Sequence, residues 1–154
     1  MIIALTGTPG SGKTETCRIL RQRGYNCVSL QEITGVSDCI SGEEVDITCL
    51  EEKVRGLCRD YIVFESHLSH LIRPDVAIIL ARDAGMVRQV LEARGYNSEK
   101  IAENIDALMS DVIYYEALAL LPSPRIYRVN AIEGKKEETA GRVALILENL
   151  LKKS

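Results

Sequence analysis

The chain has 154 residues, of which 46% are hydrophobic and 27% are charged. These values are typical of a soluble globular protein and exclude a disordered, collagen-like or small disulfide-stapled chain. Its 19 Lys and Arg against 22 Asp and Glu give a net charge of −3, which excludes a global basic footprint for nucleic acid but not a local basic patch.

Short β-rich runs alternate along the chain with longer segments of helical period. The predicted strands cover 1–6, 25–30, 61–65, 76–80 and 125–129. The predicted helices cover 13–23, 48–59, 84–93, 98–121 and 137–152, with Ser98 as the N-cap of the fourth and Pro122 at its end. This alternation predicts the α/β class, as a three-layer α/β/α fold around a five-stranded parallel sheet, in one domain over 1–154. No apolar run approaches the length of a membrane span, so we expect no membrane partner.

The segment 7–14, GTPGSGKT, satisfies the phosphate-binding loop pattern G-x-x-x-x-G-K-[ST], with a predicted strand before it and a predicted helix after it. Backbone N–H groups and the positive end of the helix dipole would converge there on nucleotide phosphates. Lys13 would bridge the β- and γ-phosphates of ATP, and the Thr14 hydroxyl would bind Mg²⁺. The loop predicts nucleotide binding through Gly10, Ser11, Gly12, Lys13 and Thr14.

The loop alone does not name the reaction, because GTPases, ATPases, kinases and motors share it. The chain has no N-K-x-D element, which GTPases use to read guanine. A length of 154 residues also leaves little room for the inserted domains of most motor ATPases. A kinase or a small ATPase fits the chain better.

Further polar residues follow the third predicted strand, and ligands of open α/β sheets bind at the carboxyl ends of strands. Glu65 could hold Mg²⁺, or it could be an ordinary carboxylate at a strand end. His67 could orient a water molecule or an acceptor phosphate, or it could be structural. We expect His70, one turn further on, to be structural.

Phosphoryl transfer also needs cations around the transferred phosphate. Arg82, Arg88 and Arg94 recur every six residues, so they cannot share one helical face. Arg94 precedes Gly95 at a predicted helix end, which makes it the best candidate for a mobile clamp. Arg88 is the second candidate and could equally be a solvated helix residue.

The cysteines have wide spacing and no CxxC pair, which favours neither a disulfide framework nor a zinc site. We predict reduced, mostly buried thiols in a cytoplasmic protein. The positions concerned are Cys17, Cys27, Cys39, Cys49 and Cys58.

Several of these motifs together resemble the adenylate kinase isoenzyme 6 family, which includes the coilin-interacting nuclear ATPase and its archaeal relatives. The resemblance runs through nearly the whole chain. It is carried by the phosphate loop, Val28-Ser29-Leu30, Glu65-Ser66-His67 and Arg94-Gly95-Tyr96-Asn97 with Lys100, Glu103 and Asn104. It implies a fold like that of nucleoside monophosphate kinases and broad-specificity transfer of the terminal phosphate of ATP to a nucleoside monophosphate, with intrinsic ATPase activity. It further implies transient binding to a small-subunit ribosomal protein during late maturation of that subunit.

By the same resemblance, Gly10, Gly12, Lys13, Thr14 and Glu15 would line ATP. Arg94 would contact ATP from a short lid over about 93–103, and the monophosphate would bind over about 30–53, where Asp46 matches an acidic position of the family. Glu15 departs from the Ser or Thr common in the family and would bring negative charge near the α-phosphate. Glu65 stands where many members carry Asp.

The sequence thus favours a Mg-ATP-dependent nucleoside monophosphate kinase with side ATPase activity, which a short, wet lid would explain. The alternative is an ATP-driven assembly switch in which monophosphate transfer is incidental. A kinase of a small non-nucleotide metabolite is a third reading. Segment 30–53 has no Arg or Lys before Lys53, so an acceptor phosphate would need cations from elsewhere, such as Arg88 or Arg18, and this gives the switch some weight. The preferred base and direct RNA contact stay open.

Overall fold

The computed structural model describes residues 1–152. Its centre is a sheet of five parallel strands in the order β2-β5-β1-β6-β7. The strands are β1 (Ile2–Thr6), β2 (Cys27–Ser29), β5 (Ile62–Glu65), β6 (Val76–Ala81) and β7 (Ile126–Asn130). All five predicted strands are present, with ends within two residues of the predicted ones. The predicted parallel sheet is therefore confirmed.

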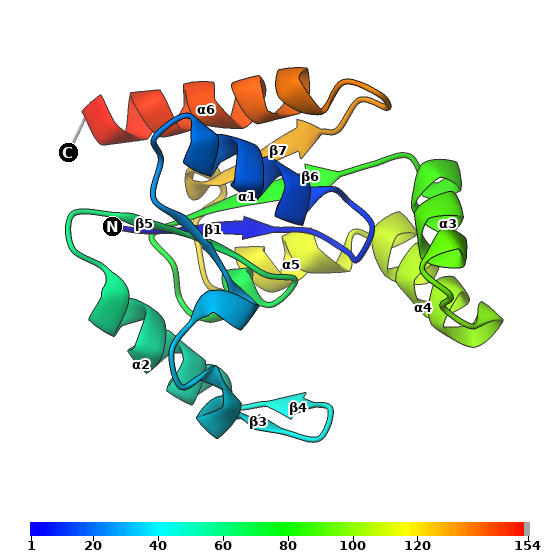
Figure 1. The fold of residues 1–154 in the computed structure, drawn as a ribbon, viewed down its shortest axis with the longest axis horizontal. Coiled ribbons are helices and arrows are strands. Elements are labelled where there is room, and N and C mark those ends of the chain that lie inside the picture. Colours follow the sequence, from blue (N-terminus) through cyan, green and yellow to red (C-terminus); the bar gives the residue numbers. More distant parts are fainter. Residues whose placement is uncertain (153–154) are drawn as a thin grey trace.

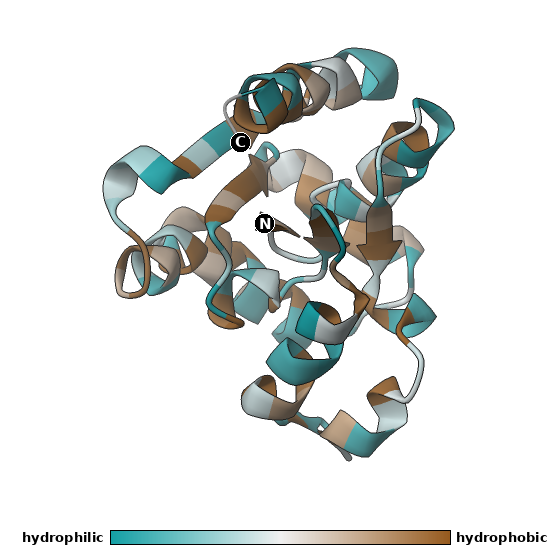
Figure 2. Ribbon diagram, turned by 90° about the vertical axis from the view of Figure 1, so that its left-hand side faces the viewer, coloured by the Kyte–Doolittle hydropathy of each residue, from teal (hydrophilic) through white to brown (hydrophobic). Residues whose placement is uncertain are grey.

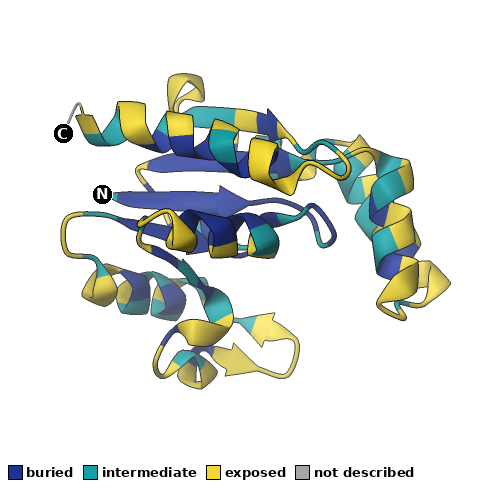
Figure 3. Cartoon of the chain, turned by 45° about the horizontal axis from the view of Figure 1, so that its top comes forward, coloured by how far each residue is buried: buried dark blue, intermediate teal, exposed yellow. Residues whose placement is uncertain are grey.

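Helices cover both faces of this sheet (Figure 1). On one face, α1 (Lys13–Gln22) and α6 (Lys136–Lys152) pack against Ile3 and Leu5 of β1. On the other face, α2 (Ile47–Leu57) and α5 (Val112–Leu118) cover Ile2 and Ala4. Because successive side chains of a strand point to opposite faces, a strand buried on both must be apolar throughout. Hydrophobic colour accordingly marks the central strands in Figure 2, and they are buried in Figure 3.

Two helices stand apart from the layered core, at the carboxyl end of the sheet (Figures 1 and 3). They are α3 (Ala84–Ala93), as predicted, and α4 (Ser98–Met109). They share a small apolar cluster of their own around Val87, Leu91 and Ile101. The segment predicted as a lid, 93–103, comprises the turn between them and the first half of α4.

The prediction of a single helix over 98–121 is wrong, because the helix is interrupted between α4 and α5. The Ser110 hydroxyl donates back to the Asp106 carbonyl at 2.8 Å, and Asp111 takes a left-handed conformation with φ 60°. An ion pair of 2.7 Å to Arg128 holds Asp111 there. Nor is Ser98 the N-cap: Asn97 caps α4, its side chain accepting from the Lys100 N–H at 2.8 Å.

The segment between β2 and α2 contains short elements that the sequence analysis did not predict. They are the 3₁₀ turns η1 (Leu30–Glu32) and η2 (Val36–Cys39) and the hairpin strands β3 (Ile40–Ser41) and β4 (Glu44–Val45). Two further 3₁₀ turns, η3 (Ser69–Leu71) and η4 (Ser123–Arg125), follow β5 and precede β7.

The prediction of reduced cysteines is wrong for four of the five positions. One disulfide joins Cys17 of α1 to Cys27 of β2, and another joins Cys39 of η2 to Cys49 of α2. The Cα atoms lie 5.6 and 5.5 Å apart, within the range that a disulfide bridges. Both pairs are ten residues apart in sequence, and only the packing of the elements brings them together. Cys58 is a free thiol.

Over residues 1–152, no helix combines the length and the apolar character that crossing a membrane requires.

Candidate active site

The phosphate-binding loop lies between the carboxyl end of β1 and the first turn of α1, as predicted. Gly12, the N-cap of α1, has φ 94°, and a Cβ there would meet the Arg82 guanidinium at 3.0 Å. A Cβ on Gly7 would lie 2.6 Å from the Leu80 carbonyl oxygen. The backbone can curl this tightly against β6 only because these positions lack side chains. The N–H groups at the start of α1 then face the loop interior, as in anion-binding helix termini.

Three buried polar side-chain atoms within residues 1–152 lack a hydrogen-bond partner, and all belong to this loop or to the residue packed against it. They are Thr8 Oγ1, Ser11 Oγ and Arg82 Nε. Buried polar atoms are nearly always hydrogen-bonded, so such a concentration indicates a site built for a polar ligand.

Lys13 is only 9% exposed, and its ammonium donates to the Thr8 carbonyl at 3.3 Å. Burial lowers the pKa of Lys13 to about 8, the negative charge of Glu65 opposes this shift, and the positive charge of Arg94 adds to it. Lys13 and Arg94 thus bring two cations toward one point. Such a point favours an anion with several negative oxygens.

The predicted metal ligands come together. The Thr14 hydroxyl donates to Glu65 Oε1, and Glu65 is 4% exposed at the carboxyl end of β5. A hydroxyl and a carboxylate side by side are hard oxygen donors that suit Mg²⁺, which takes only one or two protein ligands and completes its shell with water and phosphate. No cluster of three or more His, Cys, Asp or Glu suited to a metal occurs in the described part of the chain.

The two histidines have different surroundings. His70 is buried, with Nδ1 2.8 Å from Thr6 Oγ1 and Nε2 3.0 Å from Glu116 Oε1, so it ties β1 to α5 in the structural place expected. His67 lines a cavity beside Lys13. Burial, and then the charges of Lys13 and His70, lower the pKa of His67, which keeps its imidazole neutral near pH 7.

Two cavities meet at the loop. The first, here the lid cavity, has a volume of about 500 Å³ and lies between the loop, the end of β5 and α4. The second, the β7-side cavity, has about 430 Å³ and lies between the loop, Arg82 and the turn after β7 that contains Ile132 and Gly134. Arg94 lines both, whereas Arg88 lines neither.

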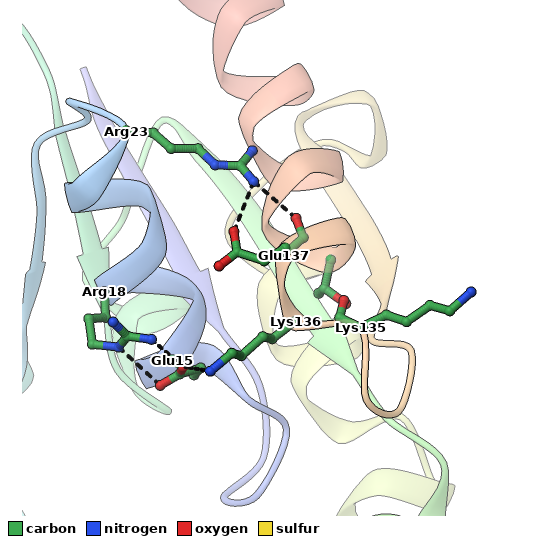
Figure 4. A network of polar contacts seen from close by, with 7 residues as sticks. Glu15, Arg18, Arg23, Lys135, Lys136 and Glu137 are labelled. Carbon is green, nitrogen blue, oxygen red and sulfur yellow. Dashed lines mark hydrogen bonds and ion pairs between the residues drawn. The ribbon is translucent and has the colours of Figure 1, made fainter.

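Glu15 lies at the rim of the β7-side cavity, and its carboxylate is paired (Figure 4). It accepts from Arg18 and from Lys136, the latter at 3.1 Å. These hydrogen bonds lower the pKa of Glu15 to about 2, and the bond from Arg18 has the larger effect. The charge that the sequence places near the α-phosphate is therefore compensated by two cations.

The acidic and basic residues of segment 30–53 do not reach either cavity. Asp46 is the N-cap of α2 and accepts from the Cys49 N–H at 3.0 Å, and Lys53 pairs with Asp38 at 3.5 Å. The segment contributes Leu30 and Gln31 to the lid cavity. Arg18 is paired with Glu15 on the outside of α1 and does not line the lid cavity.

The sequence analysis did not single out two polar residues that line these cavities, Gln31 and Lys136. It named Arg82 without a role and Lys100 only as part of the resemblance. The position of Arg82 directly after the fourth strand could have revealed its place in the site, because ligands lie at the carboxyl ends of parallel strands. No local pattern marks the other residues.

This fold and this site define a P-loop phosphotransferase, a nucleotide-binding protein of kinase type. Residues 3–109 match the family model described as AAA domain. Relatives named "Putative adenylate kinase" include one of Thermoplasma volcanium, 42% identical over 147 residues that cover 96% of this chain and 94% of the relative. A relative of the same name from Archaeoglobus fulgidus is 37% identical, and the match covers 96% of this chain and 82% of the relative. The chain belongs to this archaeal family of AAA-domain adenylate kinase-like proteins.

Among solved structures, shikimate kinase from Acinetobacter baumannii is similar with a TM-score of 0.66 at 16% identity, covering 96% of this chain and 93% of that one. Shikimate kinase from Bacteroides thetaiotaomicron is similar with a TM-score of 0.64 at 14% identity, and the match covers 96% of this chain and 98% of that one. At these identities the similarity shows the fold and not the substrate.

Proposed function

We propose that the protein is a nucleoside monophosphate kinase that transfers the terminal phosphate of Mg-ATP to a nucleoside monophosphate. The observation that carries the proposal is the pair of cavities meeting at the phosphate loop, with Arg94 lining both and Lys13 lining the lid cavity. A protein that only hydrolyses ATP needs a cavity for one nucleotide. The names of the archaeal relatives agree with two nucleotide substrates.

In this proposal the β7-side cavity takes the base and ribose of ATP, and the loop takes its phosphates. Thr14 and Glu65 would hold Mg²⁺, which neutralises charge on the β- and γ-phosphates when bound. The lid cavity then takes the acceptor, with its phosphate facing the γ-phosphate of ATP. We treat 1–154 as one kinase domain with an acceptor segment over about 30–53 and a lid over about 93–103.

The chain's own residues would favour transfer in three ways. Lys13 and Arg94 contact oxygens that gain charge in the transition state, where fixed cations in a desolvated site are most effective. Neutral His67 orients the acceptor phosphate or a water molecule by hydrogen bonds. Closure of the α3–α4 pair over the lid cavity brings Arg94 in and excludes water.

We further propose side ATPase activity, because the lid is short and a wetter site admits water as the acceptor. The resemblance to the adenylate kinase isoenzyme 6 family suggests transient binding to a small-subunit ribosomal protein in late subunit maturation, with RNA contacted indirectly. Exposed apolar side chains at the α4–α5 junction favour a protein partner and keep the assembly switch as a second function; they are Met109, Val112, Tyr115 and Leu118.

We keep the cytoplasm as its location, although the two disulfides are unusual in a reducing compartment.

The test is ADP production from Mg-ATP at fixed enzyme, with and without each of AMP, CMP, UMP and dGMP. The kinase proposal expects strong stimulation by one or more monophosphates, with the matching diphosphate formed in equal amount. Equal slow ADP release in every tube contradicts it and supports the switch. The addition of candidate ribosomal proteins would then show whether one of them changes the rate.

A further inference from the structure

The lid cavity contains three cationic side chains within residues 1–152, those of Lys13, Arg94 and Lys100. Two of them belong to the ATP phosphates. Lys13 is part of the loop itself. Arg94 also lines the β7-side cavity, and it is close enough to Lys13 for its positive charge to lower the pKa of that lysine. Lys100, on α4, lines the lid cavity but not the β7-side cavity. It therefore faces the space left for the acceptor.

The acceptor segment supplies no cation to this space. Lys53, its only basic residue, is held by Asp38 and does not line the cavity. The phosphate of a nucleoside monophosphate carries nearly two negative charges at neutral pH, and transferring such a group from water without compensation is very unfavourable. A cation must come from another element.

The other cations that the sequence suggested for this role lie elsewhere. Arg88 is exposed on α3 and lines neither cavity. Arg18 is engaged by Glu15 on the outside of α1. Lys100 remains, because its side chain takes part in none of the ion pairs or side-chain hydrogen bonds found within residues 1–152.

The backbone of Lys100 is held firmly, although its side chain is exposed. Its N–H is capped by Asn97 at 2.8 Å, and its carbonyl accepts from Asn104 Nδ2 at 2.8 Å. Next to it, Ile101 is buried in the apolar cluster shared by α3 and α4. Glu103, one turn along, also lines the cavity and is suited to accept hydrogen bonds from a ribose or base.

We propose that Lys100 binds the phosphate of the acceptor nucleoside monophosphate. This deepens the proposed function and rests on it. Lys100 is then the residue that couples acceptor binding to the lid, because the bound phosphate draws α4 toward the loop and brings Arg94 with it. The acceptor class is any nucleoside monophosphate, since an ammonium recognises the phosphate and not the base.

The experiment compares the wild type with Lys100→Gln, Lys100→Arg and Arg88→Gln. Titration calorimetry measures binding of AMP, CMP, UMP and dGMP to each protein, and steady-state assays give kcat and KM for both substrates. Arg88→Gln is the matched control, because it removes one exposed positive charge from the same helix pair without touching either cavity. Thermal unfolding checks that each variant is folded.

We expect Lys100→Gln to raise the Kd and KM for the monophosphate by about ten-fold or more, the usual loss for a charge-assisted hydrogen bond. The KM for ATP and the rate of ATP hydrolysis without acceptor should stay within about two-fold, and Lys100→Arg should restore much of the affinity. Arg88→Gln should behave as the wild type.

An unchanged monophosphate Kd in Lys100→Gln overturns the inference, as does an equal loss of ATP affinity or an equal effect of Arg88→Gln. If the wild type binds a monophosphate through Lys100 but forms no diphosphate, the proposed function fails and the binding role stands. If the wild type binds no monophosphate at all, both are overturned.

Discussion

At the scale of single residues, Lys13 is charged in a place where burial disfavours charge. Its lowered pKa of about 8 means that the ammonium form predominates below pH 8 and is lost as the pH rises through that value, more than two units before an ordinary lysine deprotonates. In the proposed function ATP binds to this ammonium, so the pH dependence of ATP binding tests the role of this residue.

We expect Mg-ATP to bind the free protein tightly up to about pH 8 and then to weaken, by up to about ten-fold per pH unit. Bound phosphates favour the charged lysine, so the loss ends where the pKa of the complex is reached. Fluorescence or calorimetric titration from pH 6.5 to 9.5 measures this. Lys13→Arg keeps its charge throughout and should show no such loss, and a flat wild-type profile would contradict the prediction.

Glu65 and Thr14 allow a test of the metal site at the same scale. Replacing Glu65 by Gln keeps the shape and removes the negative oxygen that suits Mg²⁺. The Mg²⁺ concentration for half-maximal ATP turnover should rise by roughly ten-fold or more. Glu43→Gln, in the exposed hairpin turn, is the control, and an equal response of the two variants would remove Glu65 from the metal site.

At the scale of elements, the disulfide between Cys39 and Cys49 links η2 to the start of α2 and so closes the acceptor segment on itself. Ile33 and Leu50 anchor this segment in the core, whereas its two-stranded hairpin is short and mostly exposed. The disulfide lies at the base of this hairpin and adds a covalent constraint to the packing.

Replacing Cys49 by Ser should lower the free energy of unfolding by about 2–3 kcal/mol in the absence of reductant, the chain-entropy value for a loop of this size. It should also weaken monophosphate binding, because Leu30 and Gln31 lose their support, and leave ATP binding unchanged. Denaturant unfolding and calorimetry measure both effects. Cys58→Ser, at the free thiol, is the control; identical unfolding of the two variants would show that the link is not stabilising.

At the scale of the whole molecule, the sheet brings together residues from four strand ends. Because β1, β5, β6 and β7 run parallel, their carboxyl ends share one edge. The phosphate loop, Glu65, Arg82 and Ile132 follow those ends in turn. The α3–α4 pair then places Arg94 at both cavities, so in the proposed reaction one side chain would act on donor and acceptor.

Arg94→Ala should therefore lower phosphate transfer and ATP hydrolysis together, each by about 100-fold or more in kcat, the usual loss for a cation at a transferring phosphate. Rates of diphosphate formation and of phosphate release on the same preparations measure the two. Hydrolysis that survives intact while transfer is lost would separate the reactions and show that Arg94 serves the acceptor only.

The sequence by itself determined the strands, the phosphate loop and the helices that flank them, because these depend on local periodicity and spacing. Short continuous apolar runs bounded by turn residues are typical of parallel strands buried on both faces, and GTPGSGKT between a strand and a helix is typical of a phosphate-binding loop. Thr14 and Glu65 could also both be predicted to bind Mg²⁺, since Thr14 belongs to the phosphate-loop motif after the first strand and Glu65 ends the third predicted strand.

Only the tertiary structure decided the rest. Some of these contacts join elements that are distant in the chain: the cysteine pairs, the ion pair of Asp111 with Arg128 between α4 and α5, and the bond of Lys136 to Glu15. The position of Lys100 at the lid cavity depends instead on which face of α4 turns inward. Such contacts leave no local pattern, because the partner is supplied by packing and not by neighbouring residues. The loop could therefore be predicted to bind a phosphate, whereas the residues that line the lid cavity appear only once α3 and α4 are placed at the carboxyl end of the sheet.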